Sequence, residues 1–233
     1  KSLASEGVHS LDPFVGTGNF ILRVMREIHE KNPRALRQKY LNELHCNEVM
    51  LLPYYIACLN IEHLYLELTG QYEAFPGICL VDTFELVEDR QIGMFTSDNT
   101  DRVQRQKDAP IYVIIGNPPY NAGQVNENDN NKNRTYPTID KRVAETYGKS
   151  SKASNKNALS DPYVKAFRMA SDRIVQDGEG VVCLVSNNGF LDGIAFDGMR
   201  RHLRCDFDKV RIVDLRGNIR RDSMRDGIPL GEE

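Results

Sequence analysis

The sequence lacks the features that are typical of a membrane-spanning protein or of a protein with a large positive net charge. It contains no tryptophan, and no apolar run in its 233 residues approaches the roughly 18 residues that a membrane span requires. We find no signal-peptide pattern and expect no membrane partner. The formal net charge of -3 provides no overall field to attract nucleic acid, so such contacts would need local basic patches.

Cysteine is sparse, and its spacing indicates neither a disulfide framework nor a metal site. The five cysteines are Cys46, Cys58, Cys79, Cys183 and Cys205. They form no C-x-x-C pair, and the five histidines have no metal-ligand spacing relative to them. We therefore expect reduced thiols in the core, no metal ion, and a cytoplasmic setting.

Apolar runs and amphipathic segments alternate along most of the chain, as expected for one α/β domain. With 40% hydrophobic residues the chain is long enough for one substantial core. Strands are predicted at 8–12, 43–48, 78–82, 111–116, 180–186 and 210–214, and helices at 20–31, 33–42, 50–69, 161–175 and 199–203. This alternation predicts a mainly parallel sheet with helices on both faces.

Two stretches within residues 1–233 interrupt the alternation, and we interpret both as excursions from the core. Residues 86–108 are polar and show no clear period. Residues 121–160 contain eight asparagines and seven basic against four acidic residues, with a possible short helix near 140–147. DNA contact, substrate gating and a plain surface loop all remain open for this second stretch. Residues 199–225 form another basic stretch, with nine basic and four acidic residues.

The apolar run 111–116 leads directly into the tetrapeptide Asn117-Pro118-Pro119-Tyr120. Two prolines remove two backbone donors and fix φ, so this tetrapeptide forms a rigid loop after the strand. The Asn117 amide oxygen and the Pro118 carbonyl offer two acceptors to one NH2 group, and Tyr120 offers a flat ring. The loop is therefore suited to hold a planar amine, although an ordinary tight turn would use the same residues.

A glycine-rich turn follows the first predicted strand, in Asp12-Pro13-Phe-Val-Gly16-Thr-Gly18-Asn-Phe20. The two glycines allow close approach of a ligand, and the N-H groups at the start of the next helix favour a carboxylate or phosphate. A dinucleotide fingerprint would have its third glycine at position 21, which is isoleucine here, so NAD is disfavoured.

An acid ends each of the first three predicted strands: Asp12, Glu48 and Asp82. The carboxyl ends of parallel strands surround the crevice in which open α/β sheets bind ligands. Glu48 is well placed for two ribose hydroxyls, but an acid at a helix N-terminus is also favoured by the helix dipole alone.

These motifs resemble those of the amino-group DNA methyltransferases, which use S-adenosylmethionine. Residues 12–20 resemble the cofactor motif of that family, and Asn117-Pro118-Pro119-Tyr120 resembles its catalytic motif. Their order is similar to that of the gamma class. Further segments resemble the methylase core of the Type ISP single-polypeptide restriction-modification enzymes: Tyr136-Pro-Thr-Ile-Asp140, 161–163 and 214–218.

The resemblance implies a Rossmann-like methyltransferase fold and a set of site residues. Asp12, Gly16 and Gly18, with Pro13 and Phe20 of the same motif, would line the methionine end of S-adenosylmethionine. Glu48 would accept hydrogen bonds from the ribose hydroxyls, and Asp82 would accept one from the adenine amino group. Phe84 would pack on the adenine ring. The resemblance also implies that residues 1–233 are a fragment whose sheet lacks its last strand. Target-recognition, helicase and nuclease domains of a larger polypeptide would then be partners.

The activity implied is methyl transfer to the N6 amino group of an adenine flipped out of double-stranded DNA, as the modification step of restriction-modification. The same loop would also fit the N4 amino group of cytosine or the side-chain amide of a glutamine in a protein. RNA in place of DNA also remains open. A methyltransferase-like module that binds DNA without catalysis is the alternative from another class.

Overall fold

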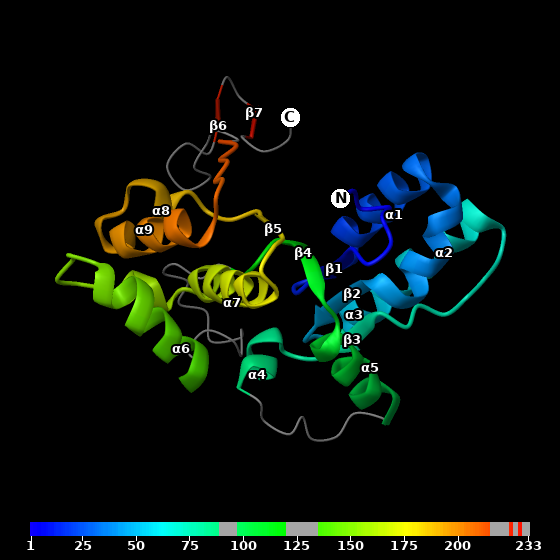
Figure 1. Ribbon diagram of the computed structural model, residues 1–233, viewed down its shortest axis with the longest axis horizontal. Coiled ribbons are helices and arrows are strands. Elements are labelled where there is room, and N and C mark those ends of the chain that lie inside the picture. Colours follow the sequence, from blue (N-terminus) through cyan, green and yellow to red (C-terminus); the bar gives the residue numbers. More distant parts are fainter. Residues whose placement is uncertain (89–96, 120–134, 215–223, 226–227, 230–233) are drawn as a thin grey trace.

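The computed structural model describes residues 1–88, 97–119, 135–214, 224–225 and 228–229. Five parallel strands form the central sheet in the order β3-β2-β1-β4-β5 (Figure 1). They are β1 (His9–Asp12), β2 (Leu44–Glu48), β3 (Ile78–Leu80), β4 (Ile111–Gly116) and β5 (Val181–Leu184). β6 (Met224–Arg225) and β7 (Ile228–Pro229) form a separate antiparallel pair.

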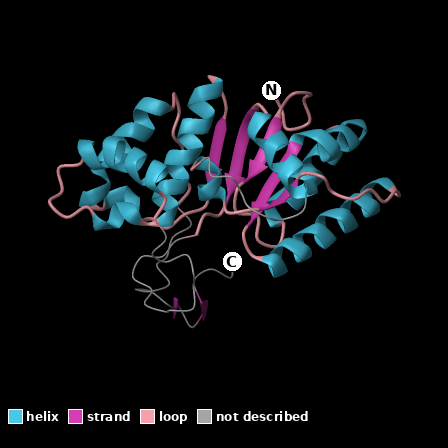
Figure 2. Cartoon of the chain, turned by 90° about the horizontal axis from the view of Figure 1, so that it is seen from below, coloured by secondary structure: helices cyan, strands magenta, loops and turns pink. Residues whose placement is uncertain are grey.

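The helices lie on both sides of this sheet, as Figure 2 shows. They are α1 (Asn19–Lys31), α2 (Leu36–Gln38), α3 (Leu51–Thr69), α4 (Thr83–Val87), α5 (Ser97–Asp108), α6 (Pro137–Val143), α7 (Pro162–Asp177), α8 (Gly189–Asp192) and α9 (Asp197–Asp206). Short π-helical or 3-10 turns occur at 33–35, 39–43, 144–148, 157–160 and 194–196. The predicted α/β fold with a parallel sheet and helices on both faces is confirmed.

Alternating side chains of the strands pack into different helical layers. Leu44 and Cys46 of β2 and Ile78 of β3 belong to the largest core cluster, together with buried residues of α1 and α3. The next residue of β3, Cys79, packs instead with Val103 of α5. Because successive side chains of a strand point to opposite faces, α1 and α3 cover one face and α5 covers the other.

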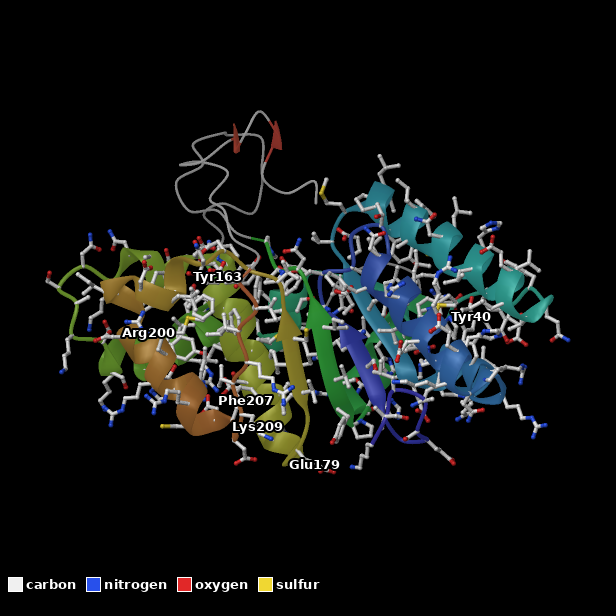
Figure 3. All side chains as sticks on the ribbon, turned by 90° about the horizontal axis from the view of Figure 1, so that it is seen from above. Tyr40, Tyr163, Glu179, Arg200, Phe207 and Lys209 are labelled. Carbon is white, nitrogen blue, oxygen red and sulfur yellow. The ribbon has the colours of Figure 1, made fainter. Side chains whose placement is uncertain are left out.

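A second, smaller core lies on the other side of the sheet, where α6, α7 and α9 meet. Tyr163 of α7 and Met199 of α9 are buried within it, and Figure 3 shows Tyr163 on the opposite side of the sheet from Tyr40 of the main core. Arg168 is only 3% exposed and is held by ion pairs to Asp172 at 2.8 Å and Asp206 at 2.9 Å. This buried guanidinium therefore joins α7 to the end of α9.

Helix α9 approaches the turn at 144–148 so closely that only glycine fits at position 198. A Cβ at Gly198 would lie 2.0 Å from the Tyr147 carbonyl oxygen and 2.8 Å from the Ser151 nitrogen, both backbone atoms. We expect Gly198→Ala to lower the free energy of unfolding by about 3 kcal/mol or more, since the backbones must separate. Urea denaturation would measure the loss. Arg201→Ala, on the exposed side of α9, is the control, and equal midpoints for the two variants would contradict the packing described.

The structure corrects three sequence-based expectations. The polar stretch 86–108 was interpreted as an excursion and no helix was predicted in it, but residues 97–108 form helix α5. The predicted strand at 210–214 is absent, because these described residues form no ladder and Val210, Ile212 and Val213 are exposed. The cysteines were expected in the core, yet Cys183 and Cys205 are exposed, whereas Cys46 and Cys79 are buried.

The other predicted helices agree with the structure within a few residues, except that the segment 33–42 is broken into short turns; α4 and α8 were not predicted. Part of the predicted excursion 121–160 is helical, as α6 and the turns that follow it. Helix α3 also leaves large apolar side chains exposed, including Leu52, Tyr55 and Leu59. In the part of the chain that is described, no helix combines the length and the apolar character needed to cross a bilayer.

Candidate functional site at the carboxyl ends of the strands

The predicted cofactor and catalytic motifs lie side by side in the middle of the sheet. The chain moves outward from β1 to β2 and β3, then returns to place β4 on the other side of β1. β1 and β4 are therefore the neighbours between which the strand order reverses, and Leu11 pairs with Ile114 across them. Ligands of open α/β sheets bind in the crevice at such a reversal. Asp12 ends one of these strands and Asn117 follows the other.

The start of the predicted cofactor motif lies close to Gly116, the residue that precedes the predicted catalytic motif. A Cβ built on Gly116 would lie 2.9 Å from Asp12 Oδ1 and 3.5 Å from Pro13 Cδ. The residue that precedes Asn117 thus has to be small because the Asp12 carboxyl group occupies the adjacent space. The backbone of Gly116 is also fixed on its other side, where its carbonyl accepts from Val185 N at 2.9 Å.

We expect Gly116→Ala to displace Asp12 and to disturb both motifs together. The predicted cost is about 1–3 kcal/mol of stability, with weaker binding of any ligand held by the turn at 12–20. Thermal unfolding and ligand titration would measure the two effects. Gly148→Ala is the matched control, because its added Cβ would meet no atom closer than 3.6 Å. A Gly116→Ala protein that behaves like the control would contradict the close approach.

Both glycines of the glycine-rich turn have left-handed backbone conformations. Gly16 has φ of 55° and Gly18 has φ of 100°, and residues other than glycine rarely adopt such positive values. The turn is tied to β2, because Val15 N donates to the Asn47 carbonyl and Gly16 N donates to Glu48 Oε2, each at 3.0 Å. Pro13 is buried, and Phe20 is partly buried in the first turn of α1.

Asp12 is fully buried beneath this turn. Its Oδ1 accepts from Phe14 N at 3.0 Å, whereas its Oδ2 is buried without a hydrogen-bond partner among the described residues. Burial raises the pKa of the Asp12 carboxyl to about 7, and the nearby Glu48 carboxylate raises it further, against the lowering effect of the Phe14 hydrogen bond. Asp12 therefore titrates near neutral pH.

Glu48 is partly buried, and its carboxylate joins three backbone groups. Oε1 accepts from Val49 N at 2.9 Å and from Met50 N at 2.8 Å, while Oε2 accepts from Gly16 N. Glu48 thus lies just before the N-cap residue Met50 of α3, where the helix dipole favours an acid, and also holds the glycine turn. A carboxylate has about four acceptor sites, so these three contacts are compatible with a further donor.

Asp82 and Phe84 lie at the start of α4, just beyond β3. Asp82 caps this helix by accepting from Phe84 N at 2.9 Å. Phe84 is 4% exposed and packs against Phe14 of the glycine turn, with ring centroids 5.5 Å apart. The ring expected to contact adenine is therefore already packed against the cofactor motif.

Thr83 connects the tips of β1, β2 and β3, and sequence reasoning assigned it no role. Its hydroxyl donates to the Pro13 carbonyl at 2.5 Å and accepts from Asn47 Nδ2 at 3.1 Å. Gln106 of α5 completes the network by donating to Asn47 Oδ1 at 2.9 Å. All three polar side chains are buried. The only sequence signal was a polar residue directly after the strand-end acid.

In the predicted catalytic loop, Asn117 and Pro119 are exposed and Pro118 is buried. Asn117 is thus accessible at the carboxyl end of β4. Tyr120 and residues 121–134, the first part of the stretch 121–160, lie outside the described residues. A cavity of about 480 Å³ lies elsewhere, against α9, where it is lined by Asp197, Arg200, Arg201, Arg204 and Cys205.

Solved structures of larger proteins match this chain closely. The DrdV–DNA complex matches with 48% identity and a TM-score of 0.81, over 89% of this chain and 20% of that one. The nuclease-deletion mutant of the Type ISP restriction-modification enzyme LlaGI, in complex with a DNA substrate mimic, matches with 42% identity and a TM-score of 0.87, over 96% and 19% of the two chains. This chain resembles part of a Type ISP enzyme.

A further Type ISP enzyme supports the same similarity. The ATP-dependent LlaBIII bound to DNA has 42% identity and a TM-score of 0.78, over 87% of this chain and 14% of that one. The Type IIL enzyme MmeI in complex with DNA, at 18% identity and a TM-score of 0.54, shares the fold. No family model and no curated protein sequence matches the chain. The chain spans about a fifth or less of the length of DrdV, LlaGI and LlaBIII.

Proposed function

We propose that this chain transfers a methyl group from S-adenosylmethionine to the N6 amino group of adenine in DNA, as the modification part of a restriction-modification enzyme. The observation that carries the proposal is the juxtaposition of the two motifs at the strand reversal, where Asp12 lies close to Gly116, the residue before Asn117. The similarity to LlaGI and LlaBIII, both Type ISP enzymes in complexes with DNA or a DNA mimic, supports the restriction-modification setting and DNA as the substrate.

The residues at the strand ends fit S-adenosylmethionine by the chemistry of their donors and acceptors. A turn with two left-handed glycines leaves open space beside Gly16, where an added Cβ would meet nothing within 4 Å. Asp12 has a buried carboxylate oxygen with no partner among the described residues, and Glu48 has acceptor capacity beside the same turn. We assign Asp12, Pro13, Gly16, Gly18 and Phe20 to the methionine end, Glu48 to the ribose, and Asp82 and Phe84 to the adenine.

Asn117 and Pro118 would perform the remaining task, which is to hold and activate the amine. S-adenosylmethionine would supply a methyl group whose bond to the sulfonium sulfur breaks as the bond to N6 forms, which leaves neutral S-adenosylhomocysteine. The methylated nitrogen is acidic and loses its extra proton to water, so no strong base is needed. The lone pair of an exocyclic N6 is delocalised into its ring, and accepting both N-H groups at Asn117 and Pro118 shifts electron density back to the nitrogen. The loop also fixes the direction of attack and stabilises the developing positive charge.

The target base must leave the duplex to reach this loop, because stacked adenine has its amino group inside the helix. We propose that Tyr120 stacks on the flipped base. The exposure of Asn117 at the end of β4 is consistent with a large substrate that approaches from outside. The basic stretch that follows Tyr120 carries the charge expected for contact with DNA phosphates.

Calorimetric titration of the full-length protein tests the cofactor assignment. We expect saturable 1:1 binding of S-adenosylmethionine and of S-adenosylhomocysteine, and no binding of NAD, since the turn lacks the third glycine of a dinucleotide site. Gly18→Val is the control that should abolish binding, because φ of 100° is strained for a β-branched residue. A protein that binds neither adenosyl compound would favour a DNA-binding module without catalysis.

A further inference from the structure

Tyr136 makes a buried hydrogen bond to one of the proposed cofactor residues, although 54 residues separate the two in the sequence. The Tyr136 hydroxyl donates to Asp82 Oδ2 at 2.7 Å. Tyr136 is 5% exposed and Asp82 is 8% exposed, so little water competes for this bond. Since Asp82 Oδ1 accepts from Phe84 N, each carboxylate oxygen has a donor that fixes it. The plane of the Asp82 carboxylate is therefore set by two elements that are distant in the chain.

The Tyr136 ring is itself held on two sides. It packs against Phe84 with ring centroids 5.2 Å apart, and the Lys165 ammonium lies 5.1 Å from its centroid. Lys165 of α7 also pairs with Asp140 at 2.6 Å, and Asp140 accepts from Tyr136 N at 2.9 Å. A tyrosine needed only to fill the core would not require this cation, acid and backbone arrangement.

Helix α6, which begins one residue after Tyr136, is anchored to α4 by Glu88. The Glu88 carboxylate accepts from Thr138 N at 2.9 Å and from Ile139 N at 3.2 Å. It therefore satisfies backbone donors that the first turn of a helix leaves unpaired. Because Asp82 precedes α4 and Glu88 follows it, α4 is linked to the Tyr136 segment at both ends. Tyr136 thus has little freedom to leave Asp82.

We propose that Tyr136 is a positioning residue for the adenosyl end of S-adenosylmethionine: it holds the Asp82 carboxylate in the orientation that receives the adenine amino group. This inference rests on the proposed function, in which Asp82 accepts from that amino group. If the carboxylate turns away, its hydrogen bond from the adenine amino group is no longer close to linear. Cofactor binding then weakens even though Asp82 is still present. Sequence reasoning found Tyr136 in a family-like segment but gave it no role.

Tyr136→Phe removes only the hydroxyl, and Tyr163→Phe is the matched control. Tyr163 is also a buried tyrosine, but its hydroxyl has no hydrogen-bond partner among the described residues. In calorimetric titrations of the full-length protein with S-adenosylhomocysteine, we expect the Tyr136→Phe Kd to rise about tenfold and the Tyr163→Phe Kd to stay at the wild-type value.

Titration of Tyr136→Phe with a second ligand distinguishes a loss of Asp82 positioning from a general loss of structure. The analogue of S-adenosylhomocysteine whose purine lacks the 6-amino group cannot donate to Asp82, so Tyr136→Phe should leave its Kd unchanged. An equal loss for both ligands would mean that the hydroxyl supports only the fold, and would overturn the inference. Wild-type affinity of Tyr136→Phe for both ligands would also overturn it.

A variant with both Asp82→Asn and Tyr136→Phe provides an independent test of the hydrogen bond between the two residues. In an Asp82→Asn background, the further change Tyr136→Phe should weaken S-adenosylhomocysteine binding much less than tenfold, since the carboxylate it orients is gone. Fully additive losses would contradict the inference while leaving the proposed function intact. If the wild-type protein binds no S-adenosylhomocysteine, the proposed function fails, and this inference fails with it.

Discussion

Asn117→Ala is expected to reduce the methylation rate by at least about a hundred- to a thousandfold while leaving the affinity for S-adenosylmethionine nearly unchanged. Asn117 is exposed at the end of β4, and in our proposal its amide oxygen accepts from the target amine and has no role in holding the cofactor. Its loss should therefore appear in kcat and not in cofactor binding. Single-turnover methylation and calorimetry would measure the two quantities separately.

Two further variants make the Asn117 prediction specific. Asn117→Asp keeps an acceptor oxygen at the same position, so it should retain more activity than Asn117→Ala. Asn157→Ala, at an exposed position in the turn at 157–160, should have wild-type kinetics. Turnover by Asn117→Ala within a factor of a few of wild type would show that the amide does not take part in the reaction.

Asp12→Asn is expected to stabilise the protein at pH 8, although it should weaken cofactor binding. The pKa of the buried carboxyl is raised to about 7, whereas the unfolded chain titrates near ~4. A raised folded-state pKa means that the contribution of Asp12 to stability is fully present below about pH 4 and is lost as the pH rises through 7. Ionised Asp12 therefore costs the fold up to about 4 kcal/mol at pH 8.

An asparagine removes that charge but places an NH2 group where Asp12 Oδ2 has no partner among the described residues, at a cost of about 1–3 kcal/mol. The expected net gain is about 1–3 kcal/mol at pH 8, falling to near zero at pH 5, where the folded carboxyl is already protonated. Urea denaturation at the two pH values would measure it, with Asp101→Asn on the exposed face of α5 as the control. A gain that does not change with pH would contradict the raised pKa.

Much of this architecture was predictable because apolar runs and acids mark the strand ends. The run at 111–116 predicted β4, and Asp12, Glu48 and Asp82 were expected at neighbouring strand ends, where the structure places them. The glycine turn was predictable for the same kind of reason, since residues 16 and 18 adopt backbone angles that favour glycine.

Other features were not predictable because they depend on contacts between distant parts of the chain. Helix α5 was missed because two of its three buried side chains are polar: Asn99 and Gln106 bury amides that bond to β3 and β2, so the segment has no hydrophobic period. Residues 210–214 have strand-like composition, but composition alone does not supply a pairing partner. The bond between Tyr136 and Asp82 joins segments that no local pattern connects.

The most direct test of the central claim is to incubate the full-length protein with methyl-labelled S-adenosylmethionine and DNA containing many adenine contexts, and then to digest the DNA to nucleosides. We predict label in N6-methyladenine and none in the Asn117→Ala control. Label in N4-methylcytosine, or in RNA or protein offered in place of DNA, would contradict adenine as the substrate. Absence of label in every substrate, with cofactor binding intact, would contradict methyl transfer itself.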